Sequence, residues 1–127
     1  MRLLLDTNIF LWCTLNDAKL TGHARALLNN AEAIYVSSAC IWEISIKKDL
    51  GKLDVADSLG ELSSAIVASG FSELPITSEH AAIVGSLKPI HRDPFDRIMI
   101  AQAISEPLIF VTADKLLEAY SNLVKVV

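Results

Sequence analysis

Arg2-Leu3-Leu4-Leu5-Asp6-Thr7-Asn8 is the stretch that decides the fold of this 127-residue chain. A short, unbroken apolar run is typical of a parallel strand that is buried on both faces. The run stops at Asp6, and an apolar helical pattern starts at Thr7. A buried strand that leads directly into a helix indicates an α/β domain.

The same alternation of strand and helix patterns continues along the chain. We predict strands at 2–5, 33–36, 71–76, 108–111 and 123–126. We predict helices at 7–15, 21–31, 38–50, 55–69, 78–87 and 114–120, and another that begins at Pro94. Suitable N-cap residues are Thr21, either Ser37 or Ser38, and Asp93. The pattern predicts an α/β three-layer domain, in which helices flank a central parallel sheet of about five strands. The order of the strands does not follow from it.

Length and composition predict one domain over residues 1–127. The 52% apolar content and mean hydropathy of +0.42 predict a well-buried core and an apolar surface patch that a partner covers. No apolar run approaches the roughly 18 residues of a membrane span, and no signal peptide is recognisable, so we expect a cytoplasmic protein. Cys13 and Cys40 share no metal or redox spacing and are expected to be reduced core residues. Trp12 and Trp42 lie in apolar helical patterns, which favours core packing over base stacking.

Four acidic residues occupy positions that solubility does not explain. Asp6 and Asp114 lie just beyond the ends of predicted strands, at the edge where parallel sheets bind ligands. Glu43 lies in a helix that is apolar nearly all round, and Asp96 lies in the first turn of the Pro94 helix. We therefore expect all four side chains at one edge of the sheet.

Each acid also has a structural interpretation. Asp6 and Asp114 could cap the helices that follow them, and Asp96 could form a capping turn with Asp93. Glu43 could pair with Lys47, its i+4 neighbour. The coincidence of four acids from four segments favours a functional site over four separate structural roles.

Electrostatics indicates what such a cluster binds. Two carboxylates about 4 Å apart repel by roughly 4 kcal/mol at an effective dielectric constant of 20, and four carboxylates form six pairs. Protons or divalent cations must neutralise them, and oxygen ligands suit Mg²⁺ or Mn²⁺. The chemistry expected of such a site is attack of an activated water on a phosphodiester. The net charge of −4 argues against nucleic-acid binding through a broad basic face, but it is compatible with such an enzyme.

Four motifs in this chain resemble those of PIN-domain nucleases, and more narrowly those of VapC-type toxins of type II toxin–antitoxin systems. They are Leu5-Asp6-Thr7-Asn8, Trp42-Glu43-Ile44, Asp93-Pro94-Phe95-Asp96-Arg97 with Ala101-Gln102-Ala103, and Val111-Thr112-Ala113-Asp114. The resemblance covers the whole chain in order. It implies a Mg²⁺- or Mn²⁺-dependent endoribonuclease, a homodimer, and inhibition by a cognate VapB-type antitoxin.

The resemblance also implies roles for individual residues. Carried over by position, the metal-binding and catalytic acids are Asp6, Glu43, Asp96 and Asp114. Residues expected to support them are Thr7, Asn8, Asp93 and Thr112, with Asp93 mainly the N-cap of its helix. Basic residues near the acids that could contact the RNA backbone are Lys47, Lys48, His91, Arg92 and Arg97, although ordinary solvated side chains would show the same pattern.

Other functions fit the sequence less well. An aspartate-nucleophile phosphatase needs a second Asp two residues after the first, where this chain has Asn8, and a phospho-accepting receiver domain needs an Asp after a middle strand, where Ser37-Ser38 follow Val36. A catalytically inert PIN-like interaction module and a DNA-directed PIN or flap-type nuclease stay open as alternatives. The RNA target, the number of metals and the identity of the antitoxin do not follow from the sequence.

Overall fold

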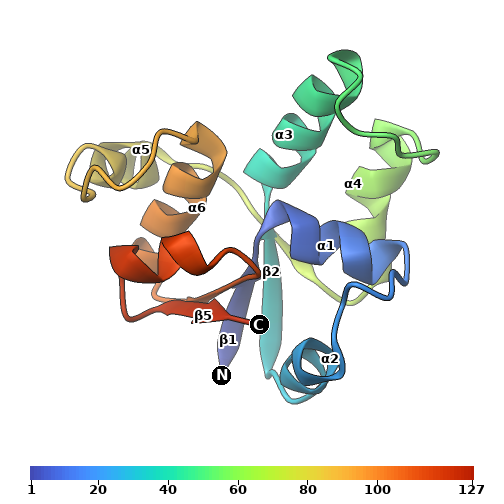
Figure 1. The fold of residues 1–127 in the computed structure, drawn as a ribbon, viewed down its shortest axis with the longest axis horizontal. Helices are drawn as coiled ribbons and strands as arrows, with labels where there is room; N and C mark the ends of the chain where they lie inside the picture. Colours follow the sequence, from blue (N-terminus) through green and yellow to red (C-terminus); the bar gives the residue numbers. More distant parts are fainter.

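A computed structural model describes residues 1–127 and confirms the predicted α/β architecture (Figure 1). Five parallel strands form one sheet in the order β3-β2-β1-β4-β5. The strands are β1 (Arg2–Leu5), β2 (Ala33–Ser37), β3 (Ser72–Leu74), β4 (Ile109–Thr112) and β5 (Val124–Val126). The chain adds β2 and β3 on one side of β1 and then returns to place β4 on the other side. The order therefore reverses between β1 and β4, which is where open parallel sheets bind ligands.

The helices agree with the predicted segments, with two differences. They are α1 (Thr7–Thr14), α2 (Gly22–Asn29), α3 (Ser38–Asp49), α4 (Leu59–Ala68), α5 (Ser78–Val84), α6 (Pro94–Ser105) and the 3-10 helix η1 (Lys115–Tyr120). The α4 helix, predicted from Val55, begins later because Ser58 and Glu61 form a reciprocal capping box. The segment after Asp114 is a 3-10 helix rather than an α-helix. Thr21, Ser37 and Asp93 are the N-caps of α2, α3 and α6.

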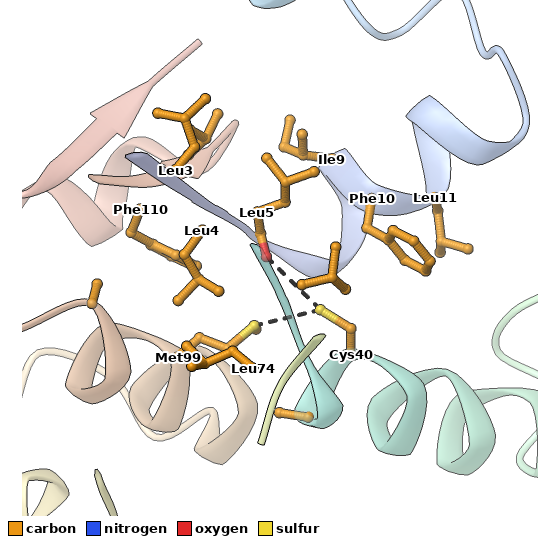
Figure 2. Packing of buried hydrophobic residues seen from close by; sticks show 14 of the residues in the cluster. Leu3, Leu4, Leu5, Ile9, Phe10, Leu11, Cys40, Leu74, Met99 and Phe110 are labelled. Carbon is orange, nitrogen blue, oxygen red and sulfur yellow. Dashed lines mark hydrogen bonds between the residues drawn. The ribbon is translucent and has the colours of Figure 1, made fainter. Parts of the chain in front are cut away.

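The central strand β1 forms the middle of the hydrophobic core. Leu3, Leu4 and Leu5 are fully buried, because side chains alternate across a strand and helices cover both faces. Figure 2 shows Leu4 on the side of Met99 and Leu5 on the side of Ile9. Packing on both faces therefore fixes the position of β1 up to Leu5, directly before Asp6.

Both cysteines are free thiols, as predicted. Cys40 is fully buried in α3, with its Sγ 3.8 Å from the Leu5 carbonyl oxygen and 3.6 Å from Met99 Sδ (Figure 2). Burial raises the pKa of the Cys40 thiol to about 12. Cys13 is only partly buried.

The prediction that Trp42 packs in the core is wrong. Its side chain is 57% exposed, and its indole ring meets Phe95 edge-on at a centroid distance of 5.0 Å. Ile46 and Leu50, one and two turns further along the chain, are also exposed. An apolar line thus runs along the outer surface of α3 and past its end, which agrees with the predicted surface patch. None of the helices has the length and apolar content needed to cross a bilayer.

Candidate active site

A wholly polar cavity of about 210 Å³ contains the four predicted acids. Its lining residues are Asp6, Thr7, Asn8, Glu43, Lys47, Asp93, Asp96 and Asp114. They come from the segments that follow β1 and β4, from α3 and from the start of α6. The lining contains five carboxylates and a single ammonium group, so it is strongly negative when its acids are ionised.

Asp6 combines a structural role with a place in the cavity. Its Oδ1 accepts a hydrogen bond from the Ile9 amide at 2.8 Å, which makes Asp6 the N-cap of α1. Its Oδ2 accepts from Thr112 Oγ1 at 2.5 Å. Burial raises the pKa of Asp6 to about 6, against the lowering effect of these two hydrogen bonds, and the nearby Asp96 and Glu43 raise it further. The N-cap interpretation and the cluster interpretation are therefore compatible.

Glu43 is buried, with 4% of its surface exposed, and lies in the middle of α3. Its Oε1 accepts a hydrogen bond from Thr7 Oγ1 at 2.5 Å. Its Oε2 forms an ion pair with Lys47, one turn further along the helix. The pair with Lys47 that the sequence left open is thus present, and it lies inside the cavity.

Asp93 and Asp96 lie at the start of α6. Asp93 Oδ1 accepts hydrogen bonds from the amides of Phe95 at 2.9 Å and Asp96 at 3.2 Å, so Asp93 is the N-cap. Asp96 Oδ2 lies 3.0 Å from His91 Nε2. Burial raises the pKa of Asp96, the hydrogen bond with His91 lowers it, and Asp93 and Glu43 raise it.

Thr112 connects the ends of the two neighbouring strands. Its hydroxyl donates to Asp6 and accepts a hydrogen bond from the Asp114 amide at 3.1 Å. Asp114 is exposed and caps η1 by accepting from the Leu116 amide at 3.0 Å. Asn8 lines the cavity at the start of α1 and is also exposed.

The basic residues predicted to contact RNA lie in different surroundings, and only one of them lines the cavity. Lys47 lines the cavity, whereas Lys48 Nζ donates to the Asp57 carbonyl at 2.9 Å. Arg97 donates to the carbonyls of Val84 and Lys88 at 3.2 and 3.0 Å, so its guanidinium anchors the loop before α6 and we do not assign it a substrate contact. Arg92 is exposed and outside the cavity lining.

Tyr120 is a residue that sequence reasoning missed. Its hydroxyl lies 2.6 Å from His91 Nδ1 and accepts from Arg97 Nη1 at 2.9 Å. It comes from the end of η1, 24 residues after Asp96, and no pattern in the sequence links the two.

The donor set of the cavity fits a divalent cation in its chemistry, because carboxylate oxygens are the ligands that Mg²⁺ and Mn²⁺ prefer. No three His, Cys, Asp or Glu side chains converge closely enough to coordinate an ion as they stand. Lys47, Thr112 and His91 each contact an oxygen of a different acid. The cavity therefore contains the four predicted acids, and each of them forms a hydrogen bond or an ion pair within the chain.

The fold and the acidic cavity define a class of α/β proteins with a polar site at the switch point of a parallel sheet. Within this class, the family model for the PIN domain matches residues 3–123. The chain therefore belongs to the PIN domain family, whose members are generally nucleases.

Solved structures with the same fold include chains of toxin–antitoxin complexes. One is in VapBC2 from Rickettsia felis bound to a promoter DNA fragment, at a TM-score of 0.72 and 19% identity, covering 98% of each chain. A toxin–antitoxin complex from Klebsiella pneumoniae matches at a TM-score of 0.65 and 20% identity, over 96% of this chain and 94% of that one. FitAcB from Neisseria gonorrhoeae matches at 0.61 and 20%, over 88% and 87%. A search of curated protein sequences found no match.

Proposed function

We propose that this chain is a metal-dependent endoribonuclease and the toxin of a type II toxin–antitoxin pair, acting in the cytoplasm as a single domain over residues 1–127. The observation that carries the proposal is the polar cavity, where five carboxylates from four segments and one lysine share the lining at the switch point of the sheet. The similarity to chains of VapBC2 and other toxin–antitoxin complexes supports the toxin assignment.

In this mechanism Asp6, Glu43, Asp96 and Asp114 would hold Mg²⁺ or Mn²⁺. The bound ion would supply Lewis-acid activation of water and stabilisation of the departing oxygen of the phosphodiester. Thr7 and Thr112 orient the carboxylates of Glu43 and Asp6 through their hydroxyl groups. Burial is the main cause of the raised pKa of Asp6, the nearby Asp96 and Glu43 add to it, and a bound cation would favour the ionised carboxylate.

We also propose that Lys47 contacts the substrate. It is the only cation of the cavity lining, and its pair with Glu43 neutralises part of the cluster. When a cation takes over that neutralisation, the ammonium group is placed to contact a phosphate of the substrate. Lys48 and Arg97 are engaged elsewhere and are not included.

Cleavage assays test the enzyme proposal. We expect the purified protein to cut RNA with Mg²⁺ or Mn²⁺ and to stop in excess chelator. Parallel assays with single-stranded DNA of matching sequence distinguish the DNA-directed alternative. Undiminished cleavage in chelator would exclude the metal mechanism, and absence of cleavage of both nucleic acids with either ion would favour the inert interaction module.

The apolar line of Trp42, Ile46 and Leu50 supports an antitoxin partner. Its Trp42 end is close to the cavity residues, because Trp42 is next to Glu43 in α3 and contacts Phe95, which is next to Asp96. We also propose a homodimer, which follows from the resemblance and which size-exclusion chromatography with light scattering tests.

Co-expression with the product of the neighbouring open reading frame tests the partner. We expect the two proteins to co-purify, and Trp42→Ser to weaken the complex. Leu116→Ser is the matched control, because Leu116 is similarly exposed but lies on η1. Equal effects of both variants would contradict the assignment of this surface.

A further inference from the structure

Residues outside the cavity lining form a chain of hydrogen bonds that ends at Asp96, one of the cavity acids. Arg97 Nη1 donates to the Tyr120 hydroxyl at 2.9 Å, the hydroxyl lies 2.6 Å from His91 Nδ1, and His91 Nε2 lies 3.0 Å from Asp96 Oδ2. The chain joins η1 to the segment before α6 and to the first turn of α6. The groups are partly buried, with 17% of the His91 side chain and 20% of the Asp96 side chain exposed.

The partners of His91 favour one tautomer of its neutral ring when Asp96 is ionised. An ionised carboxylate only accepts, so His91 Nε2 must carry the proton that bonds to Asp96. In the neutral ring Nδ1 is then an acceptor, and the Tyr120 hydroxyl donates to it. The two lone pairs of that hydroxyl accept from Arg97 and from the His91 amide at 3.2 Å. The His91 carbonyl oxygen, 3.3 Å from the same hydroxyl, is a second acceptor for its proton, and the shorter 2.6 Å contact favours donation to Nδ1.

We propose that His91 and Tyr120 are positioning residues that orient Asp96 for metal binding, with Tyr120 selecting the His91 tautomer that donates to Asp96. This inference rests on the proposed function, because it assigns Asp96 to the metal. It replaces the expectation that His91 contacts substrate, since both ring nitrogens are occupied inside the protein.

Asp96 needs such an anchor because of its neighbours. Asp93 lies three residues earlier on the same helix start, and both Asp93 and Glu43 repel its charge. The bond from His91 holds Oδ2, whereas Oδ1 has no hydrogen-bond partner within the chain and Asp96 lines the cavity. One carboxylate oxygen is therefore fixed and the other is available to a cation. Partners that orient the ligands of a metal commonly change affinity or activity by about 10- to 100-fold when removed.

Two substitutions of His91 separate its two nitrogens. The amide nitrogen of His91→Gln can replace Nε2 and keep the donor to Asp96, whereas the shorter amide of His91→Asn reaches only the position of Nδ1. We expect His91→Asn to weaken Mn²⁺ binding about 10- to 100-fold, with kcat falling more than KM changes. His91→Gln should retain most of both. Mn²⁺ binding by electron paramagnetic resonance provides a measurement that does not depend on cleavage.

Nitrogen-15 NMR of the His91 ring tests the role of Tyr120. We expect the wild-type ring to be protonated at Nε2, and Tyr120→Phe to give a mixture of tautomers together with weaker Mn²⁺ binding. Thermal denaturation identifies any variant that fails to fold, and the wild-type NMR result stands without variants.

The proposal is overturned if folded His91→Asn binds Mn²⁺ like the wild type, if Asn and Gln cause equal losses, or if the wild-type ring carries its proton on Nδ1. A wild type that binds Mn²⁺ but cleaves no RNA would contradict the proposed function and leave these three measurements to decide the positioning role.

Discussion

The substitution Asp6→Asn should stabilise the metal-free protein above neutral pH and destabilise it in acid. Asp6 is 7% exposed and accepts hydrogen bonds from Ile9 and Thr112. Asparagine caps a helix about as well as aspartate, so the bond from the Ile9 amide survives. The amide removes the charge but can present its oxygen to only one of the two donors, so the hydroxyl of Thr112 loses its acceptor.

The magnitude follows from the pKa of Asp6. A pKa of about 6 in the folded protein, raised from 3.8, corresponds to about 3 kcal/mol at 1.36 kcal/mol per pH unit. Because the folded pKa is the higher one, the unfolded chain loses its proton first, and stability falls as pH rises from 3.8 to about 6. Above about pH 6, the ionised Asp6 lowers the free energy of unfolding by the full amount of about 3 kcal/mol. Loss of the buried acceptor of Thr112 costs about 1–2 kcal/mol at every pH. The net effect is a gain of about 1–2 kcal/mol near pH 7.5 and a loss of similar size near pH 4.

Urea denaturation of wild type and variant between about pH 4 and 8, in chelator, measures this crossover. Asp17→Asn is the matched control: Asp17 also accepts from a backbone amide, that of Lys19 at 2.9 Å, but lies outside the cavity. This variant controls for replacing a carboxylate that accepts from a backbone amide. Added Mg²⁺ should stabilise the wild type more than Asp6→Asn, because a ligand of the folded state alone shifts unfolding by mass action. Parallel stability curves for wild type and Asp6→Asn would refute the reasoning.

Three further predictions concern other residues. Glu43→Gln should lower RNA cleavage by about 100-fold or more with the fold intact, whereas Glu79→Gln on the exposed start of α5 should not; retained cleavage would give Glu43 a purely structural role. Arg97→Lys should lower the free energy of unfolding by about 2 kcal/mol through lost hydrogen bonds, and an unchanged urea midpoint would contradict this. A thiol reagent should modify the partly exposed Cys13 but spare Cys40 until unfolding, since Cys40 is fully buried and burial raises its pKa to about 12; mass spectrometry after labelling decides.

The positions of Asp6 and Asp114 could be predicted because they depend on one local rule. Each follows a strand, and the carboxyl ends of parallel strands meet at one edge. That β1 and β4 are direct neighbours could not be predicted, since the order of strands depends on which helix faces pack together. The bond between Thr112 and Asp6 depends on that order and was equally inaccessible.

The exposure of Trp42 and the contact of Tyr120 with His91 could not be predicted from sequence patterns. The α3 helix is apolar nearly all round, so periodicity could not identify its outer face, and Trp42 was placed in the core. Tyr120 contacts His91 across two segments joined only by tertiary structure. For Glu43, the sequence offers a functional site and an ion pair with Lys47 as alternatives, and the structure shows the ion pair within the acidic cavity.

The hydrogen bond between Thr112 and Asp6 joins residues that lie 106 positions apart in the chain. It can therefore form only after both strands have been synthesised. Asp6 is synthesised well before β4, so β1 lacks its second neighbour until β4 has been made, and Asp114 comes later still. Because chains fold as they emerge, a nascent chain can assemble β1, β2 and β3 without completing the cavity. For a protein with the proposed activity, a chain whose synthesis stops before Asp114 would lack the complete set of acids in the cavity.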